Sequence, residues 1–160
     1  MARTSTKRFD AAGLIVSLHV ATGAAAGALA GSRRRALLLG PFLHLAGDRV
    51  PHEDIPNRRF EITSGAACMA LLALRRGVFD ASTLGAAAAS APDLEHLFKQ
   101  LRPGGEKLFH GRHGWHRSGR RFSASVQLLL AGGIVGLLTS MRLAGIEPAT
   151  LRSGGARSIP

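Results

Sequence analysis

A stretch of 20 residues without a charged side chain, residues 11–30, most constrains how this chain can fold. As an α-helix it would measure roughly 30 Å, which matches the apolar core of a bilayer. Gly23, Gly27 and Gly31 recur every four residues, a spacing that lets two helices approach closely. His19 lies in the middle of the stretch, and an ionisable residue at membrane depth is a functional candidate. A secretory signal peptide is the alternative interpretation.

Further apolar segments follow, and residues that favour strands are scarce. We therefore predict an all-α fold, a multipass Gly/Ala-rich helical bundle of about five helices in the inner (plasma) membrane. Basic residues occur in several of the connections between segments, so the orientation in the membrane stays open. The later apolar segments cover residues 36–49, 61–74, 82–89 and 125–141. The chain then divides into a basic N-terminal segment (1–10), a helical membrane domain (11–143) and a disordered tail (144–160).

The formal net charge of +11 favours either nucleic acid or an anionic membrane surface as a partner. The basic residues are spread over the loops and the tail, and only 5% of the residues are aromatic, so no base-stacking surface is evident. We expect membrane lipid as the partner and no nucleic acid. The single cysteine, Cys68, excludes an intramolecular disulfide.

The sequence HLAGDRVPH, residues 44–52, holds three possible metal ligands. His44 and Asp48 are four residues apart and would share a helix face. Pro51 disfavours helix at the residue before it, so His52 would lie just beyond the helix end and point at the same place. The alternative is an ordinary polar helix end.

A second group of ligand types is PDLEH, residues 92–96. Asp93 and His96 are three apart and share a face of a regular helix, whereas Glu95 points elsewhere. A capping role for Asp93 at a new helix start is the alternative. Together with His19 and the first group, Asp93 and His96 form the expected ligand set.

Residues 109–118, FHGRHGWHRS, add three histidines at a spacing of three. This region could close over the site and bring His113 and His116 as further ligands. Arg112 and Arg117 could then bind a phosphate of a lipid or of a substrate. The alternative is a basic interfacial loop that holds Trp115 at the level of the head groups.

Neutral imidazole combined with carboxylate suits a divalent metal, above all zinc, with manganese or iron as alternatives. We therefore predict a membrane-embedded metal-dependent hydrolase that acts on a phosphoester or lipid-like substrate through metal-activated water. Glu95 or Glu53 would serve as the general base. Two alternatives stay open: a non-enzymatic membrane protein with a structural His/Asp metal site, and a haem-binding bundle with His19 and His96 as axial ligands.

Three short motifs also resemble a known family, the YdjM-type inner-membrane metal-dependent hydrolases. They are a histidine in a Gly/Ala-rich first helix (His19), the sequence P-D-x-E-H at residues 92–96, and a His-rich stretch matched loosely by residues 113–118. The resemblance covers about residues 15–140 and implies a multipass α-helical membrane protein with a metal centre. A weaker likeness, in His and Asp usage only, is to all-α zinc phospholipases.

Overall fold

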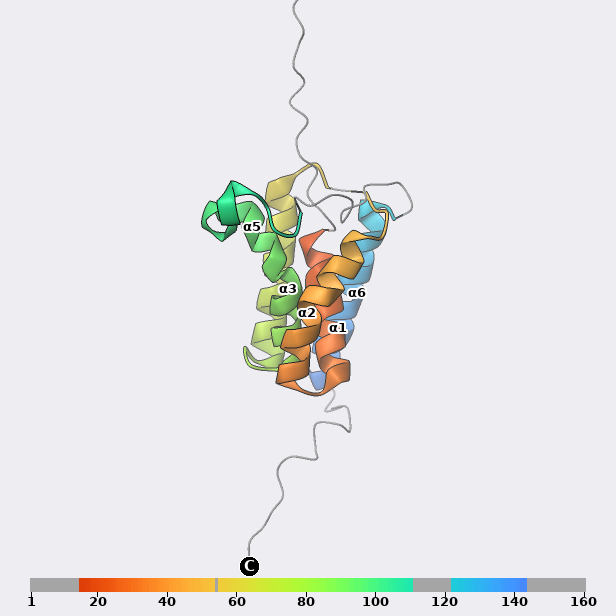
Figure 1. Ribbon diagram of the computed structural model, residues 1–160. Helices are drawn as coiled ribbons and strands as arrows, with labels where there is room; N and C mark the ends of the chain where they lie inside the picture. Colours follow the sequence, from red (N-terminus) through yellow and green to blue (C-terminus); the bar gives the residue numbers. More distant parts are fainter. Residues whose placement is uncertain (1–14, 54, 111–121, 144–160) are drawn as a thin grey trace, which may run out of the picture.

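The computed structural model describes residues 15–53, 55–110 and 122–143, in which helices joined by turns and loops form the fold, with no β-strand among these residues (Figure 1). This confirms the predicted all-α class. A very short helix, α5, and three 3-10 turns connect α4 to the loop that precedes α6. The helices are α1 (Val16–Ala30), α2 (Arg33–Asp48), α3 (Arg58–Arg76), α4 (Ala81–Ser90), α5 (Leu94–Leu97) and α6 (Ala124–Leu143), and the 3-10 turns are Ala91–Asp93, Lys99–Leu101 and Pro103–Gly105.

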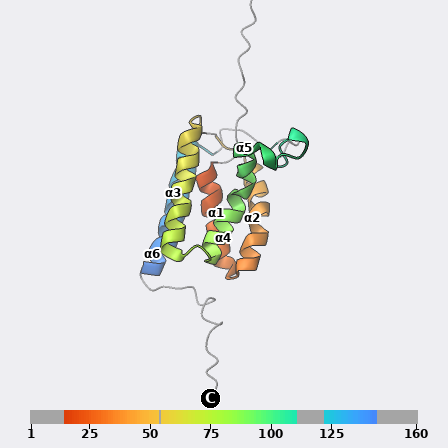
Figure 2. The same ribbon diagram turned by 90° about the vertical axis from the view of Figure 1, so that its left-hand side faces the viewer.

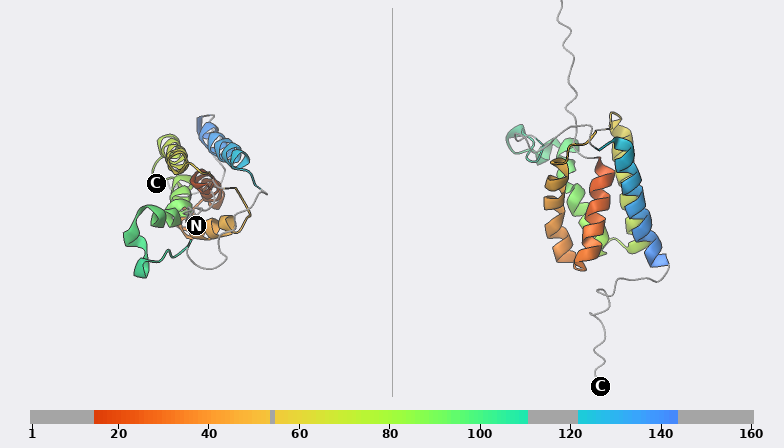
Figure 3. Two further views of the ribbon diagram at one scale, coloured as in Figure 1. Left: turned by 90° about the horizontal axis from the view of Figure 1, so that it is seen from above. Right: turned by 90° about the vertical axis from the view of Figure 1, so that its right-hand side faces the viewer.

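Helix α1 is the centre of the bundle. It packs against α2, α3, α4 and α6, which surround it when the bundle is seen end-on (Figure 3). The five longer helices alternate in direction, so the start of α1 and the ends of α2 and α4 lie at the same end of the molecule (Figures 1 and 2). Buried side chains along α1, among them Leu18, Val20 and Ala24, form the apolar core with Leu72 and Val135.

Close backbone contact between α1 and α4 explains the glycine spacing. A Cβ atom added at Gly23 or at Gly85 would collide with the backbone oxygen of the other, and one at Gly27 would collide with the oxygen of Ala81. Only glycine allows two helices to approach at this distance. The helix then ends at Gly31, which adopts the left-handed conformation that favours glycine.

Helix ends follow side-chain caps more closely than they follow the limits of apolar segments. Asn57 accepts hydrogen bonds from the amides of Arg59 and Phe60, and α3 therefore begins earlier than residue 61. Asp80 accepts from the amide of Ser82 and starts α4. Helix α2 ends at Asp48, ahead of the proline at residue 51 as expected.

One helix in the described part of the chain is long and apolar enough to cross a membrane, over Ala124–Met141 of α6. Helix α1 is apolar but has only 15 residues. Large apolar side chains are nevertheless exposed around the outside of the bundle: Leu29, Leu74 and Leu129 are 85%, 83% and 75% exposed. The expected multipass arrangement is thus not shown by helix length and composition.

Candidate metal centre

Three histidines and two aspartates meet inside one end of the bundle. His19 comes from the first turn of α1, and His44 and Asp48 come from the last two turns of α2. Asp93 lies in the 3-10 turn after α4, and His110 lies in the loop that follows α5. His19, His44 and Asp48 are at most 1% exposed. Segments that are far apart in the sequence therefore bring five possible metal ligands to one buried place.

The donor atoms of this cluster lie at short and similar distances. Nε2 of His44 lies 3.2 Å from Nε2 of His110 and 3.4 Å from Oδ2 of Asp48. Nε2 of His110 lies 3.4 Å from the same Asp48 oxygen and 3.5 Å from Oδ1 of Asp93. Nε2 of His19 lies 3.3 Å from the other Asp48 oxygen, Oδ1. The five residues thus form two overlapping groups of three, His19 with His44 and Asp48, and His44 with Asp93 and His110, which share His44.

The other ring nitrogen of His44 is held by the backbone. Its Nδ1 lies 2.9 Å from the carbonyl oxygen of Ala89, which can only accept, so Nδ1 carries the proton. In the tautomer that this contact selects, Nε2 carries no proton, and this atom faces Asp48 and His110. Backbone carbonyls orient metal-binding histidines in this way.

Glu95 holds His110 in the same manner. Oε1 of Glu95 lies 2.6 Å from Nδ1 of His110, and the carboxylate also accepts the backbone amides of Leu108, Phe109 and His110. Burial raises the pKa of the Glu95 carboxyl, but the hydrogen bonds from the His110 ring and these amides outweigh it and keep the pKa below its usual value. Glu95 is a charged, buried anchor for the loop and for the imidazole.

The cluster has the features of a cation site. Oδ2 of Asp93 is buried without a hydrogen-bond partner, although buried polar atoms are nearly always paired, and Nε2 of His19 and Oδ1 of Asp48 face only each other, 3.3 Å apart. Ligand atoms around tetrahedral zinc, at about 2.1 Å from the metal, lie roughly 3.3–3.4 Å from one another. Five of the donor separations, 3.2–3.5 Å, match this spacing, and the sixth, between Nε2 of His44 and Oδ1 of Asp93, is 3.9 Å. The residues present therefore fit a divalent metal.

His96 lies beside the cluster, with its ring packed edge-on against His110 at 4.1 Å between centroids. Its Nε2 is buried without a hydrogen-bond partner. Burial and the neighbouring His110 lower the pKa of His96 to about 4, so the ring is neutral at physiological pH. With Glu95 and His110 it forms a third group of three possible metal ligands, whose ligand atoms lie within 4.8 Å of one another.

Two of the expected site residues lie away from the cluster. His52 is buried, but its Nδ1 lies 2.5 Å from the carbonyl oxygen of Val50, and the ring is in none of the three metal-ligand groups. The side chain of Glu53 is exposed, and its backbone pairs with Phe122. Because the helix ends at Asp48, the four-residue spacing no longer determines where the next residues point.

Other expected residues are differently placed. Glu95, expected as a general base, has its oxygens engaged by His110 and backbone amides rather than directed at the cluster centre. His113, His116, Arg112 and Arg117 lie outside the described residues. His110 was not among the expected ligands, and no sequence signal distinguishes it from the two histidines that follow it.

A helical bundle with a buried His/Asp cluster is the class of protein that the fold and the site define. Searches of family models, curated proteins and solved structures gave no match to this chain.

Proposed function

We propose that this protein is a membrane-embedded metal-dependent hydrolase whose metal is held by the buried cluster. The observation that carries the proposal is the meeting of five metal-ligand residues from four segments in two overlapping groups that share His44. His19, His44 and His110 would bind through Nε2, and Asp48 and Asp93 through carboxylate oxygens. Three imidazoles with two carboxylates suit zinc, and also manganese or iron.

A divalent cation in this position would supply Lewis acidity, which promotes ionisation of water near neutral pH and stabilises negative charge on a reacting oxygen. The residues of the chain prepare the site for such a cation. The Ala89 carbonyl and Glu95 keep His44 and His110 in the orientation that presents Nε2 to the centre.

Location in the inner membrane, with several spans, is the second part of the proposal. Exposed leucines and phenylalanines cover α2 and the outer faces of α3 and α6, and apolar patches of this extent mark contact with lipid or with protein. Helices α1 and α4 approach closely at glycine residues, as helices that associate in lipid commonly do. The bundle would then present the cluster near one face of the membrane.

The resemblance to YdjM-type hydrolases supports the same proposal. Two of its motifs, the first-helix histidine and P-D-x-E-H, supply His19, Asp93 and Glu95, all of which take part in or adjoin the cluster. A phosphoester or a lipid-like ester is the substrate class that we propose.

Metal analysis tests this proposal directly. We expect the detergent-purified full chain to carry stoichiometric zinc, manganese or iron, and Asp93→Asn, which keeps the side-chain shape, to lose most of it. Glu106→Gln is the matched control, because Glu106 is exposed and belongs to none of the metal-ligand groups. Equal metal content in both variants would contradict the assignment.

A non-enzymatic protein with a structural metal site is the second candidate, and the near-complete burial of His19, His44 and Asp48 favours it. A structural site is closed by protein ligands, whereas a catalytic site keeps a position for water. If the metal-loaded protein hydrolyses p-nitrophenyl phosphate or a fatty-acyl ester, and Asp93→Asn does not, the metal site is catalytic rather than structural.

A further inference from the structure

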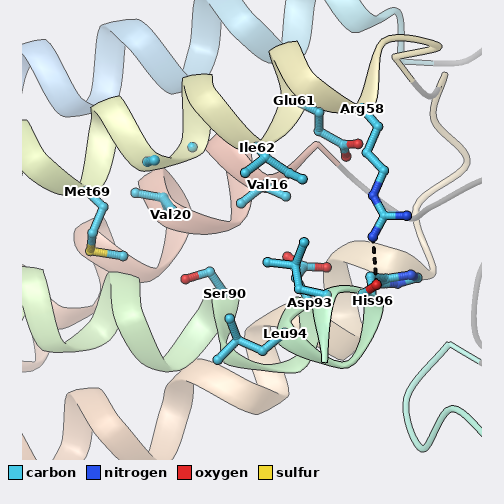
Figure 4. Close-up of a pocket in the computed structure, with 13 residues that line it drawn as sticks. Val16, Val20, Arg58, Glu61, Ile62, Met69, Ser90, Asp93, Leu94 and His96 are labelled. Carbon is cyan, nitrogen blue, oxygen red and sulfur yellow. Dashed lines mark hydrogen bonds between the residues drawn. The ribbon is translucent and has the colours of Figure 1, made fainter. Parts of the chain in front are cut away.

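A cavity of about 230 Å³ adjoins the metal cluster. Helix α3 forms one wall, the end of α4 with α5 forms the other, and the start of α1 forms the floor (Figure 4). Most of the lining is apolar. The apolar side chains are Val16, Val20, Ile62, Ala66, Met69, Leu94 and Leu97.

The polar lining residues include two that connect the cavity to the cluster, Asp93 and His96 (Figure 4). Oδ1 of Asp93 is the oxygen 3.5 Å from Nε2 of His110, so one carboxylate belongs both to the cluster and to the cavity wall. Arg58 also lines the cavity, and its guanidinium donates to the carbonyl oxygen of His96 at 2.6 Å. Among the described residues Arg58 is the only cationic side chain that lines this cavity, and Glu61 on the same helix is buried in its wall.

The cavity faces the side of the bundle. Helix α3 packs mainly against α1 and α6 and less against α4. The cavity lies in the space between α3 and α4, which their side chains line but do not fill. Leu94, Leu97 and Phe98, at the same end, are each between 41% and 52% exposed. A molecule with an apolar chain could therefore enter from the side, between apolar side chains, and reach the cluster with its other end.

We propose that this cavity binds one acyl chain of an anionic lipid, with the head group between Arg58 and the cluster. The apolar walls match the chain, and the guanidinium of Arg58 matches an anionic group, which arginine binds through paired hydrogen bonds. The proposal rests on the proposed function only for the role of the cluster, since it names the substrate class for that site. The apolar walls would hold the acyl chain without metal, whereas the head group meets the carboxylates of Asp93 and Glu61 as well as Arg58 and therefore needs the cation.

Photolabelling in a bilayer tests the occupant. The full chain is reconstituted in phosphatidylcholine vesicles that contain a small proportion of phosphatidic acid with a diazirine in the middle of one acyl chain. After illumination, cross-linked peptides are mapped by mass spectrometry. We expect labels on Val20, Ile62 or Met69, removed by excess unlabelled phosphatidic acid but not by extra phosphatidylcholine or inorganic phosphate. Labelling confined to outward-facing residues such as Leu129 would overturn the proposal.

Two pairs of variants make the test specific. Ala66→Phe fills the cavity and should lower cavity labelling about 10-fold, whereas Ala67→Phe, one residue along and outside the lining, should not. Arg58→Gln, at an exposed position, should weaken competition by phosphatidic acid about 10-fold, and Arg59→Gln should have no effect. Equal labelling in Ala66→Phe and Ala67→Phe, or equal competition in the two arginine variants, would contradict the assigned site.

Metal content measured on the same samples separates the two proposals. Stoichiometric metal without cavity labelling would overturn the lipid site and leave the metal centre standing. Cavity labelling that responds to Ala66→Phe, in protein that binds no metal, would support the lipid site and overturn the proposed hydrolase.

Discussion

Helices α1 and α6 carry the same glycine spacing and use it differently. In α1, a Cβ atom at Gly23 or Gly27 would overlap the backbone of α4. In α6, a Cβ atom at Gly132 or Gly136 would meet nothing within 4 Å in the described part of the chain. Glycines spaced by four therefore only permit another helix to approach closely, and the neighbouring helix determines whether such a contact forms. The tightly packed side, α1 with α2 and α4, also carries most of the buried donors.

Gly23→Ala should have the largest effect on stability, because the added methyl group lies directly in the close contact between α1 and α4. The added methyl would overlap the backbone of Gly85 and lie 2.5 Å from Cβ of Ala89, so the two helices must separate. We expect a loss of about 3 kcal/mol or more in the free energy of unfolding. Denaturation in detergent, followed by circular dichroism, measures it. If Gly23→Ala had the same free energy of unfolding as the wild-type protein, α1 and α4 would be less closely packed than described.

Glu95→Gln tests the support that α5 gives to the cluster. It keeps the size of the side chain and removes the charge that orients His110. We expect metal affinity to fall about 10- to 100-fold, as for other groups that hold a metal ligand in place. Competition with a chelator measures the affinity, and Glu106→Gln again serves as the control. Unchanged affinity would remove Glu95 from the site.

Arg76 connects the two sides of the bundle. At the end of α3, its Nε donates to Oδ1 of Asp80 at 3.0 Å, and its Nη1 donates to the carbonyl oxygen of Leu138 in α6 at 3.1 Å. Burial alone raises the pKa of Asp80, but the hydrogen bonds from Arg76 and from Ser82 outweigh it and hold the pKa below its usual value. The ionised form of Asp80 is therefore the one that the fold stabilises.

A pH series on Asp80→Asn measures this connection. Asparagine keeps an oxygen for the cap but loses the charge. We therefore expect the Asp80→Asn protein to be less stable than the wild type by about 0.5–1 kcal/mol at pH 7. Because the folded-state pKa is lowered, the difference is complete above the unfolded pKa of about 3.9 and disappears as the pH falls through the folded value. Chemical denaturation of both proteins between neutral and acidic pH gives the curve. A gap that does not change with pH would mean that the charge contributes nothing.

The spacing of residues along the sequence predicted those features of the fold and the site that are determined within a single helix. The all-α class follows from apolar segments, and the four-residue spacing of His44 and Asp48 places both on the face of α2 that points inward. His52 and His110 show where this reasoning ends. The direction of the chain after residue 48 depends on contacts with the segment before α6, and the position of His110 depends on a carboxylate 15 residues earlier that binds three loop amides.

Gly136→Ala should have the smallest effect and the opposite sign, and it completes the comparison with Gly23→Ala. Position 136 is exposed, and a methyl there meets open space. Alanine costs less conformational entropy than glycine inside a helix, so we expect a gain of roughly 0.5–1 kcal/mol in the same denaturation assay.

A loss of stability in Gly136→Ala would instead mean that another segment or a second copy of the chain packs against α6 in solution. Repeating the measurement over a range of protein concentrations separates these two outcomes, since only contact between copies makes the loss depend on concentration. A gain at every concentration would show that the spacing in α6 is not used for close packing, while the same spacing in α1 holds the bundle together.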